Sequence, residues 1–278
     1  MTPAPKRRLK ILEAASYLRE RMWSRDFSDS RRTTSSEKTQ GISVVIPAHN
    51  EERYIKDCVL SIAALKDPAI HEIIVVDNAS TDRTAEIARS VPGVTVVREP
   101  HKGITWARQK GLDIATGDLY AAIDADVRIS PQWLATVKRR FQDPNIVSLS
   151  GPYGYYDLTR WKNFIIRFLL QLILAEQRIM GKHTELIRGG NTVYRMPALR
   201  AAGGFNTDIL FYGEDVDTFM RIRKFGKTAY DPRMSALSSG RRFNAEGFWK
   251  MLFIYRVNSV WQHLFAKPLL HITEHDWR

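Results

Sequence analysis

Hydrophobic residues along the chain form short runs separated by longer amphipathic segments. The short runs are rich in Val, Ile and Ala and predict β-strands, at 42–48, 71–79, 94–100 and 119–126. The segments between them carry apolar residues at helical spacing and predict helices, at 51–65, 80–91 and 104–117. Strands and helices alternate regularly, which predicts an α/β fold with a mostly parallel central sheet and right-handed crossovers.

The predicted domain lies between two terminal additions. Residues 1–40 consist of a basic segment that predicts a short helix, followed by a linker rich in Ser and Thr. We place the domain at 41–245 and an aromatic and basic helical tail at 246–278. The length of 278 residues is sufficient for one large α/β domain.

Neither a signal peptide nor a transmembrane helix is expected. Charges interrupt the segment after the basic N-terminus before it forms an apolar core. The longest apolar stretch, 164–175, contains Arg167 and is shorter than the roughly 18 residues needed to span a bilayer. The single cysteine, Cys58, fits a reducing compartment and is expected to be a small buried residue of a helix. These features predict a cytoplasmic protein.

The charge balance is basic. The chain has 42 Lys and Arg against 30 Asp and Glu, a net charge of +12. Such a charge favours phosphate-bearing ligands, nucleic acid or an anionic membrane surface as partners, and charge alone does not choose among them.

The apolar run LYAAI is followed by two acids, Asp124 and Asp126. Alternate residues of a strand share a face, so we expect both carboxylates on one face at the end of the strand, where they can bind a hard divalent cation. Alternatively, one acid caps the next turn and the other faces solvent. Polar residues also follow two other predicted strands, in PAHNEE and DNASTD. Because ligands of parallel sheets bind at the carboxyl ends of strands, this edge is the predicted site.

Six motifs occur in a characteristic order: VVIPAHNEE, VVDNASTDRT, GITWARQKGLDIATGD, DAD, GGF and GED. With this set, residues 41–245 resemble glycosyltransferase family 2. The resemblance implies a GT-A (Rossmann-like) fold and an inverting transfer from a nucleotide-diphosphate sugar, which we expect to be a UDP-sugar. Each motif alone is weak, whereas the ordered set is specific.

The resemblance assigns donor residues. Pro47, His49 and Glu51 would border the nucleotide, and Asp77 would accept a hydrogen bond from the uracil N3–H. Arg98, together with Lys102, would reach the base or a phosphate from the loop after the third strand. The alternatives are a helix-capping role for Asp77, a plain loop role for His49 and solvent-facing charges for the two basic residues.

The metal and diphosphate assignments also follow from the resemblance. Asp126 would join Mg²⁺ or Mn²⁺ to the diphosphate, and Asp124 would contact the ribose, or the metal through water. Arg241 and Arg242 would bind the diphosphate, with a solvated basic turn as the alternative.

On the acceptor side, Gly189, Gly190 and Asn191 would let the backbone approach the sugars, although a simple turn also explains them. Within GED, Asp215 would be the catalytic base and Glu214 would orient it or bind the acceptor.

The predicted function is transfer of a sugar to a glycan or lipid-linked acceptor in envelope polysaccharide or glycolipid synthesis. A polyprenyl-phosphate glycosyltransferase and a nucleotidyltransferase are enzyme alternatives, and a basic non-catalytic nucleic-acid-binding protein is the alternative from another class. We expect no nucleic-acid partner. The helices at 161–180 and 247–265 can cover the core, pair with another subunit or lie on the cytoplasmic face of an anionic membrane.

Overall fold

The computed structural model describes residues 40–179, 189–209 and 213–265. The predicted N-terminal helix and linker, and the last part of the C-terminal tail, lie outside the described residues.

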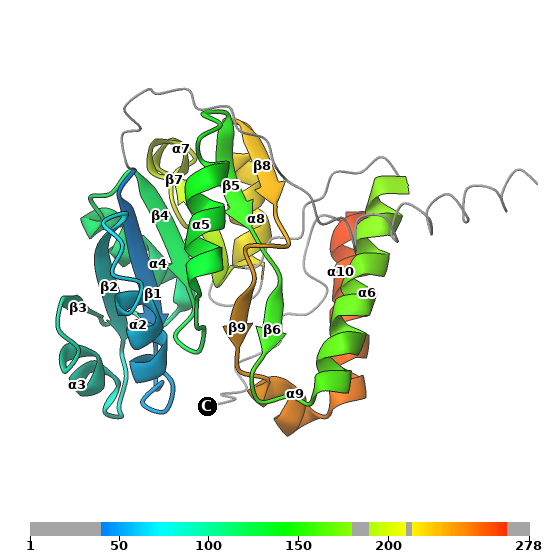
Figure 1. Cartoon of the computed structure of the whole chain (residues 1–278), viewed down its shortest axis with the longest axis horizontal. Helices are drawn as coiled ribbons and strands as arrows, with labels where there is room; N and C mark the ends of the chain where they lie inside the picture. Colours follow the sequence, from blue (N-terminus) through cyan, green and yellow to red (C-terminus); the bar gives the residue numbers. More distant parts are fainter. Residues whose placement is uncertain (1–39, 180–188, 210–212, 266–278) are drawn as a thin grey trace, which may run out of the picture. The chain divides into compact units, whose positions relative to one another are not determined.

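Seven strands form the central sheet, in the order β3-β2-β1-β4-β7-β5-β8 (Figure 1). Their bounds are β1 Ile42–Ala48, β2 Ile70–Asn78, β3 Val94–Glu99, β4 Leu119–Ile123, β5 Ile146–Ser150, β7 Asn191–Arg195 and β8 Lys227–Tyr230. Pairing is parallel except where β7 meets β4 and β5, so the sheet is mostly parallel, as predicted. A second, two-stranded sheet pairs β6 (Tyr153–Tyr155) with β9 (Ala236–Ser238).

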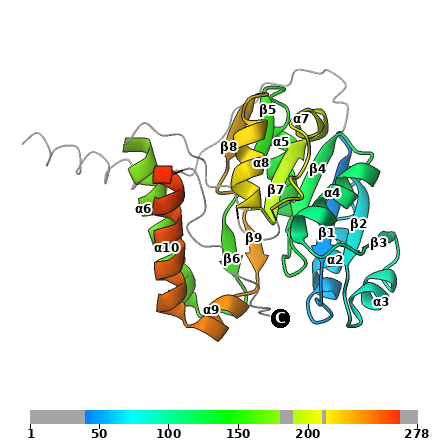
Figure 2. The same cartoon turned by 180° about the vertical axis from the view of Figure 1, so that it is seen from behind.

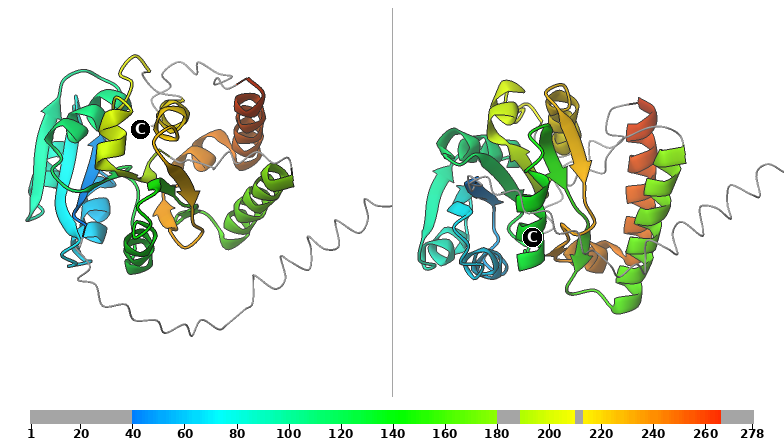
Figure 3. Two further views of the ribbon diagram at one scale, coloured as in Figure 1. Left: turned by 90° about the horizontal axis from the view of Figure 1, so that it is seen from above. Right: turned by 45° about the horizontal axis from the view of Figure 1, so that its top comes forward.

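Helices cover both faces of the central sheet (Figure 2). Their bounds are α2 Ile55–Ala63, α3 Thr84–Arg89, α4 Ile104–Ile114, α5 Pro131–Arg140, α7 Met196–Ala201 and α8 Glu214–Ile222. One hydrophobic cluster joins the sheet to α2, α3 and α5, and a second joins it to α4, α7 and α8. This is a three-layer α/β/α arrangement. Beside these layers lie α6 (Arg160–Ile179), α9 (Arg241–Glu246) and α10 (Phe248–Phe265) (Figure 3).

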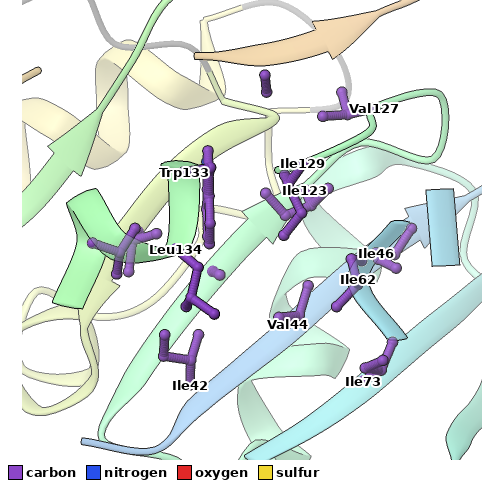
Figure 4. Close-up of a cluster of buried hydrophobic side chains, with 14 of the residues drawn as sticks. Ile42, Val44, Ile46, Ile62, Ile73, Ile123, Val127, Ile129, Trp133 and Leu134 are labelled. Atoms are coloured by element: carbon purple, nitrogen blue, oxygen red, sulfur yellow. The ribbon is translucent and has the colours of Figure 1, made fainter. Parts of the chain in front are cut away.

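The alternation of side chains along β1 explains how one strand serves both clusters. Ile42, Val44 and Ile46 face the first cluster, which also contains Trp133 of α5 (Figure 4), and Val45 faces the second. All are buried, as expected for a central parallel strand. Such a strand holds the residues at its carboxyl end in fixed positions.

The structure corrects several predicted boundaries. β4 ends at Ile123, so Asp124 and Asp126 lie in the turn after the strand and strand alternation does not set their directions. Arg98 lies within β3, as the strand predicted at 94–100 requires, and not in the loop that follows it. The helix predicted to stop at Gly117 ends at Ile114. Gly117 instead packs closely against the start of β1, because a Cβ there would lie 2.7 Å from the Gly41 carbonyl oxygen.

Candidate functional site

Predicted donor residues gather where β1 and β2 end. Pro47 is buried in β1, and His49 follows the strand with its Nδ1 only 2.6 Å from the carbonyl oxygen of Asn78. Asn78 in turn donates to the Glu99 and His101 carbonyl oxygens and accepts from the Gly103 N–H. The buried Asn78 therefore connects the loops after β2 and β3 by hydrogen bonds, and its carbonyl oxygen positions the His49 ring.

Asp77 and Arg98 lie side by side on adjacent strands. They are paired in the register of β2 with β3, with Asp77 buried and Arg98 exposed. The Asp77 Oδ1 accepts a hydrogen bond from the Ser80 N–H at 3.3 Å, a turn-forming contact that leaves Oδ2 for another donor. This geometry is compatible with the predicted contact to a base. The helix-capping alternative is wrong, because α3 begins at Thr84 with Arg83 as its N-cap, and Asp77 forms a turn with Ser80 instead. Lys102 is exposed on the loop between β3 and α4.

Glu51, Asp126 and Arg241 form a second group. The Arg241 guanidinium makes a bidentate ion pair with Glu51, at 2.7 and 2.8 Å, and its Nη2 lies 3.5 Å from an Asp126 oxygen. It also lies 5.0 Å from the centre of the Tyr54 ring. Burial opposes the charge of Arg241, but Glu51 and Asp126 outweigh it and raise its pKa. Arg242 is half-buried beside this group, and its charge reaches Asp126.

The turn before α9 carries Arg241 to the sheet. Asp157 accepts hydrogen bonds from the Ser239 hydroxyl at 2.7 Å and from the Gly240 N–H. The Ser239 hydroxyl accepts from the Arg241 N–H at 3.2 Å. A Cβ at Gly240 would lie 2.5 Å from a Leu158 carbon, so the turn requires a glycine there. These contacts explain why Ser239 and Gly240 occur in SSGRRF.

Asp126 is suited to a cation. Burial raises its pKa to about 7, with the charges of Asp124 and Glu51 adding to the effect and Arg241 opposing it. Within the described ranges no three His, Cys, Asp or Glu side chains form a metal cage. The carboxylate oxygens fit a hard ion such as Mg²⁺ or Mn²⁺, which can bind one or two carboxylates and take further ligands from phosphate and water.

Arg108 of α4 connects Asp124 with Glu214. Its Nη2 donates to Asp124 at 3.0 Å and its Nη1 to Glu214 at 2.8 Å, while its side chain is 2% exposed. Glu214 and Asp124 outweigh the effect of burial and raise the pKa of Arg108. One buried cation thus joins an acid after β4 to an acid at the start of α8.

Sequence analysis did not single out Arg108. The signal was present: Thr105, Arg108 and Leu112 fall on the buried stripe of α4. A charged residue on such a stripe requires a buried partner.

Gly189 and Gly190 leave room for these charged groups. A Cβ at Gly190 would lie 1.9 Å from the Asp124 carboxyl, and a Cβ at Gly189 would lie 2.9 Å from both Arg108 Nη1 and Glu214 Oε1. The Gly190 carbonyl oxygen also accepts from the Asp124 N–H at 3.2 Å. The glycines are needed because carboxylates pack against their backbone.

Glu214 and Asp215 are adjacent acids at the start of α8. Burial and the charge of Asp215 raise the pKa of Glu214 to about 7, against the opposing charge of Arg108. Burial also raises the pKa of Asp215, although the N–H groups of Val216 and Gly189 stabilise its carboxylate. Glu214 is thus the acid of this pair that makes the ion pair with Arg108, whereas Asp215 accepts backbone N–H groups.

Asn191 does not reach this site, contrary to the expectation of an acceptor contact. It is fully buried, and its Oδ1 accepts from the Trp133 Nε1 at 2.7 Å. Its Nδ2 donates to the carbonyl oxygens of Gly151 and Met234. With these bonds Asn191 joins β7 to α5 and to the segment before β9, and its role is structural.

The fold is that of a GT-A glycosyltransferase. A mannosyltransferase from Pyrobaculum calidifontis, solved with GDP-mannose and Mn²⁺, superposes with a TM-score of 0.64, at 23% identity over 92% of this chain and 72% of that chain. Glucosyl-3-phosphoglycerate synthase of Mycobacterium tuberculosis, solved with Mn²⁺ and UDP-glucose, gives a TM-score of 0.55 at 21% identity over 82% of this chain and 84% of that chain.

The chain belongs to glycosyltransferase family 2. The sequence profile described as Glycosyl transferase family 2 matches residues 43–203. A glucosyl-dolichyl phosphate glucuronosyltransferase of Haloferax volcanii is 27% identical over 60% of this chain and 56% of that protein. The chain spans 43% to 61% of the lengths of the first curated relatives it matches. In the part of the chain that the structure describes, no helix is long and apolar enough to cross a membrane.

Proposed function

We propose that the protein is an inverting glycosyltransferase that moves a sugar from a UDP-sugar to a glycan or lipid-linked acceptor. The observation that carries this proposal is the bridge made by the Arg108 guanidinium. It binds Asp124, which lies on the side of the predicted donor residues, and Glu214, which lies beside the predicted base. A transferase requires its donor and acceptor groups to be held in fixed relative positions.

On the donor side, Asp77 would accept the uracil N3–H, beside Pro47 and His49. Asp126 would hold Mg²⁺ or Mn²⁺, whose positive charge stabilises the departing diphosphate. Arg241 and Arg242 lie next to Asp126 and would add donors for the diphosphate oxygens. Arg241 would then exchange part of its contact with Glu51 for phosphate.

On the acceptor side, Asp215 would act as the general base. The acceptor oxygen attacks the anomeric carbon from the face opposite the diphosphate, the bond from carbon to phosphate oxygen breaks, and the acceptor proton passes to Asp215. Its raised pKa makes the carboxylate a stronger base, and its position next to Glu214 keeps it beside Arg108. Inversion follows from the single displacement.

The acceptor class rests on the relatives. Two of them are named for dolichyl-phosphate chemistry, the Haloferax volcanii enzyme and a dolichol-phosphate mannosyltransferase of Pyrococcus furiosus. Their names favour a lipid-linked acceptor in envelope glycolipid or polysaccharide synthesis, reached from the cytoplasmic face of a membrane. A polyprenyl phosphate is the second candidate; being already ionised, it would need no base.

The test combines a donor screen with a base variant. Nucleotide sugars are incubated with the protein, Mn²⁺ and candidate acceptors, and release of nucleoside diphosphate is measured. Asp215→Asn should keep donor affinity within a few-fold by calorimetry, while turnover falls by about 10² to 10⁴, the usual contribution of a general base. Asp217→Asn is the matched control, since Asp217 lies on the same helix and pairs with Arg221.

The outcomes separate the alternatives. Near-normal turnover in Asp215→Asn would exclude Asp215 as the base and favour the polyprenyl-phosphate acceptor. Absence of nucleoside diphosphate release from every donor would contradict the proposed activity itself.

A further inference from the structure

The outer face of α6 is apolar where a solvent-facing helix would be polar. Trp161, Phe164, Phe168 and Leu172 recur at helical spacing and are all exposed, Phe164 to 68%. A different stripe of the same helix is buried and includes Ile166. Among the described residues, α6 contacts the fold through this buried stripe, and none of them covers the exposed apolar one.

The helix α10 repeats this arrangement. Phe248 and Met251 pack inward in the same cluster as Ile166, while Trp249 and Phe253 are 66% and 70% exposed. The two helices meet through aromatic rings at their N-terminal ends, where Trp161 and Phe248 lie 5.4 Å apart between centroids. Figures 1 and 2 show α6 and α10 running together beside the sheet. We define the docking face as the exposed apolar residues Trp161, Phe164, Phe168, Leu169, Leu172, Trp249 and Phe253.

Basic residues lie on the same two helices as the docking face. Arg160, Arg167, Lys250 and Arg256 are exposed on the two helices, and Lys162 lies over the ring of Phe248. In sequence, α6 and α10 together carry six Lys and Arg residues and a single acid, Glu176. Aromatic rings with basic neighbours match the interface of an anionic bilayer, where rings enter the headgroup region and cations bind lipid phosphates.

We propose that α6 and α10 form a membrane-docking face that lies in the plane of an anionic lipid surface. The helices are 20 and 18 residues long, and neither is apolar enough to cross a bilayer. The inference deepens the proposed function, because docking would bring the enzyme to its lipid-linked acceptor. α10 also follows α9, whose first residue is Arg241, so the docking face is joined directly to the donor site.

The experiment is vesicle flotation of the full chain. The probes are phosphatidylcholine vesicles with and without phosphatidylglycerol, containing neither nucleotide nor glycan, so the result is independent of the transfer activity. The parent chain should float with anionic vesicles at low salt and remain below at high salt, since charge attraction is screened over about 10 Å at 0.1 M.

Substitution of the docking face should remove flotation. The Phe164→Gln, Phe168→Gln and Phe253→Gln triple variant should lower the vesicle partition coefficient about tenfold or more, because buried apolar rings supply much of interfacial binding. Since these side chains are exposed, its thermal stability should match that of the parent. The control is the Met220→Gln, Phe225→Gln double variant, which removes apolar residues exposed elsewhere and should float as the parent does.

Three results would overturn the proposal. The first is that the parent chain fails to float with either the neutral or the anionic vesicles. In the second, the parent is a dimer by light scattering and the triple variant a monomer, which assigns the face to a second copy of the chain. In the third, the triple variant loses much of its thermal stability, which shows that another segment of the same chain covers the face.

Discussion

Replacing Arg108 with methionine tests the buried bridge between the two sides of the site. Methionine keeps most of the side-chain length but leaves Glu214 and Asp124 without their shared cation. Arg108 is 2% exposed, and the Glu214 and Asp124 side chains are 12% and 38% exposed. The cost should come from Glu214, because water reaches Asp124 and screens its charge.

The expected loss of unfolding free energy is about 3 kcal/mol above pH 7, where Glu214 of the parent chain is mostly ionised, the low end for removing one partner of a buried ion pair. At about 2–4 °C per kcal/mol for a chain of this size, the melting temperature should fall by roughly 6–12 °C. The loss is moderated because the Arg108 Nε is already buried without a hydrogen-bond partner among the described residues.

Urea unfolding followed by circular dichroism measures the loss. Adding Glu214→Gln to the Arg108→Met chain should recover roughly half of it, since the stranded carboxylate is then gone. The loss should also shrink as the pH falls, because Glu214 can then take up a proton. A loss below about 1 kcal/mol, or no recovery in the double variant, would refute the assignment of Arg108 as a required counter-ion.

Three further predictions follow from the same site. Asp126→Ala should abolish Mn²⁺-dependent UDP binding, measured by calorimetry, without loss of the fold; equal affinity in both chains with and without EDTA would remove Asp126 from the metal site. Gly190→Ala should lower donor affinity and turnover, because its Cβ would lie 1.9 Å from the Asp124 carboxyl; unchanged kinetics would contradict the packing of these groups. The pKa of Glu214 is raised from its ordinary 4.5 to about 7, so the folded chain holds this proton more tightly than the unfolded chain does. Its contribution to stability is complete below about pH 4.5 and is lost as the pH rises through about 7. Glu214→Gln should therefore flatten the dependence of unfolding free energy on pH over this range, and an unchanged slope would argue against the raised pKa.

The order of strands and helices from β1 to β4 could be predicted from the sequence. Apolar residues in β1 and β4 recur with the spacing of buried strands, and the amphipathic segments between them give α2, α3 and α4. These patterns are local, because burial of one face is encoded every two residues in a strand and every three to four in a helix. The polar residues after β1, β2 and β4 were predicted to share one edge because parallel strands end together.

The partners of the charged residues were decided by the tertiary structure. Arg241 pairs with Glu51 across 190 positions of sequence, and Arg108 pairs with Glu214 across 106. Such contacts depend on which strands become neighbours, and local spacing carries no record of that choice.

Asn191 and Asp124 also show that the sequence does not predict the contacts of a single side chain. Both are candidate site residues of the sequence analysis, yet Asn191 turns into the core toward Trp133, while Asp124 leaves the strand end toward Arg108. The sequence by itself determined the mostly parallel sheet and the edge at which polar groups meet. Only the tertiary structure decided which of those groups face one another, because packing β4 against the antiparallel β7 brings Gly190 onto Asp124 and leaves space for one buried cation between two acids.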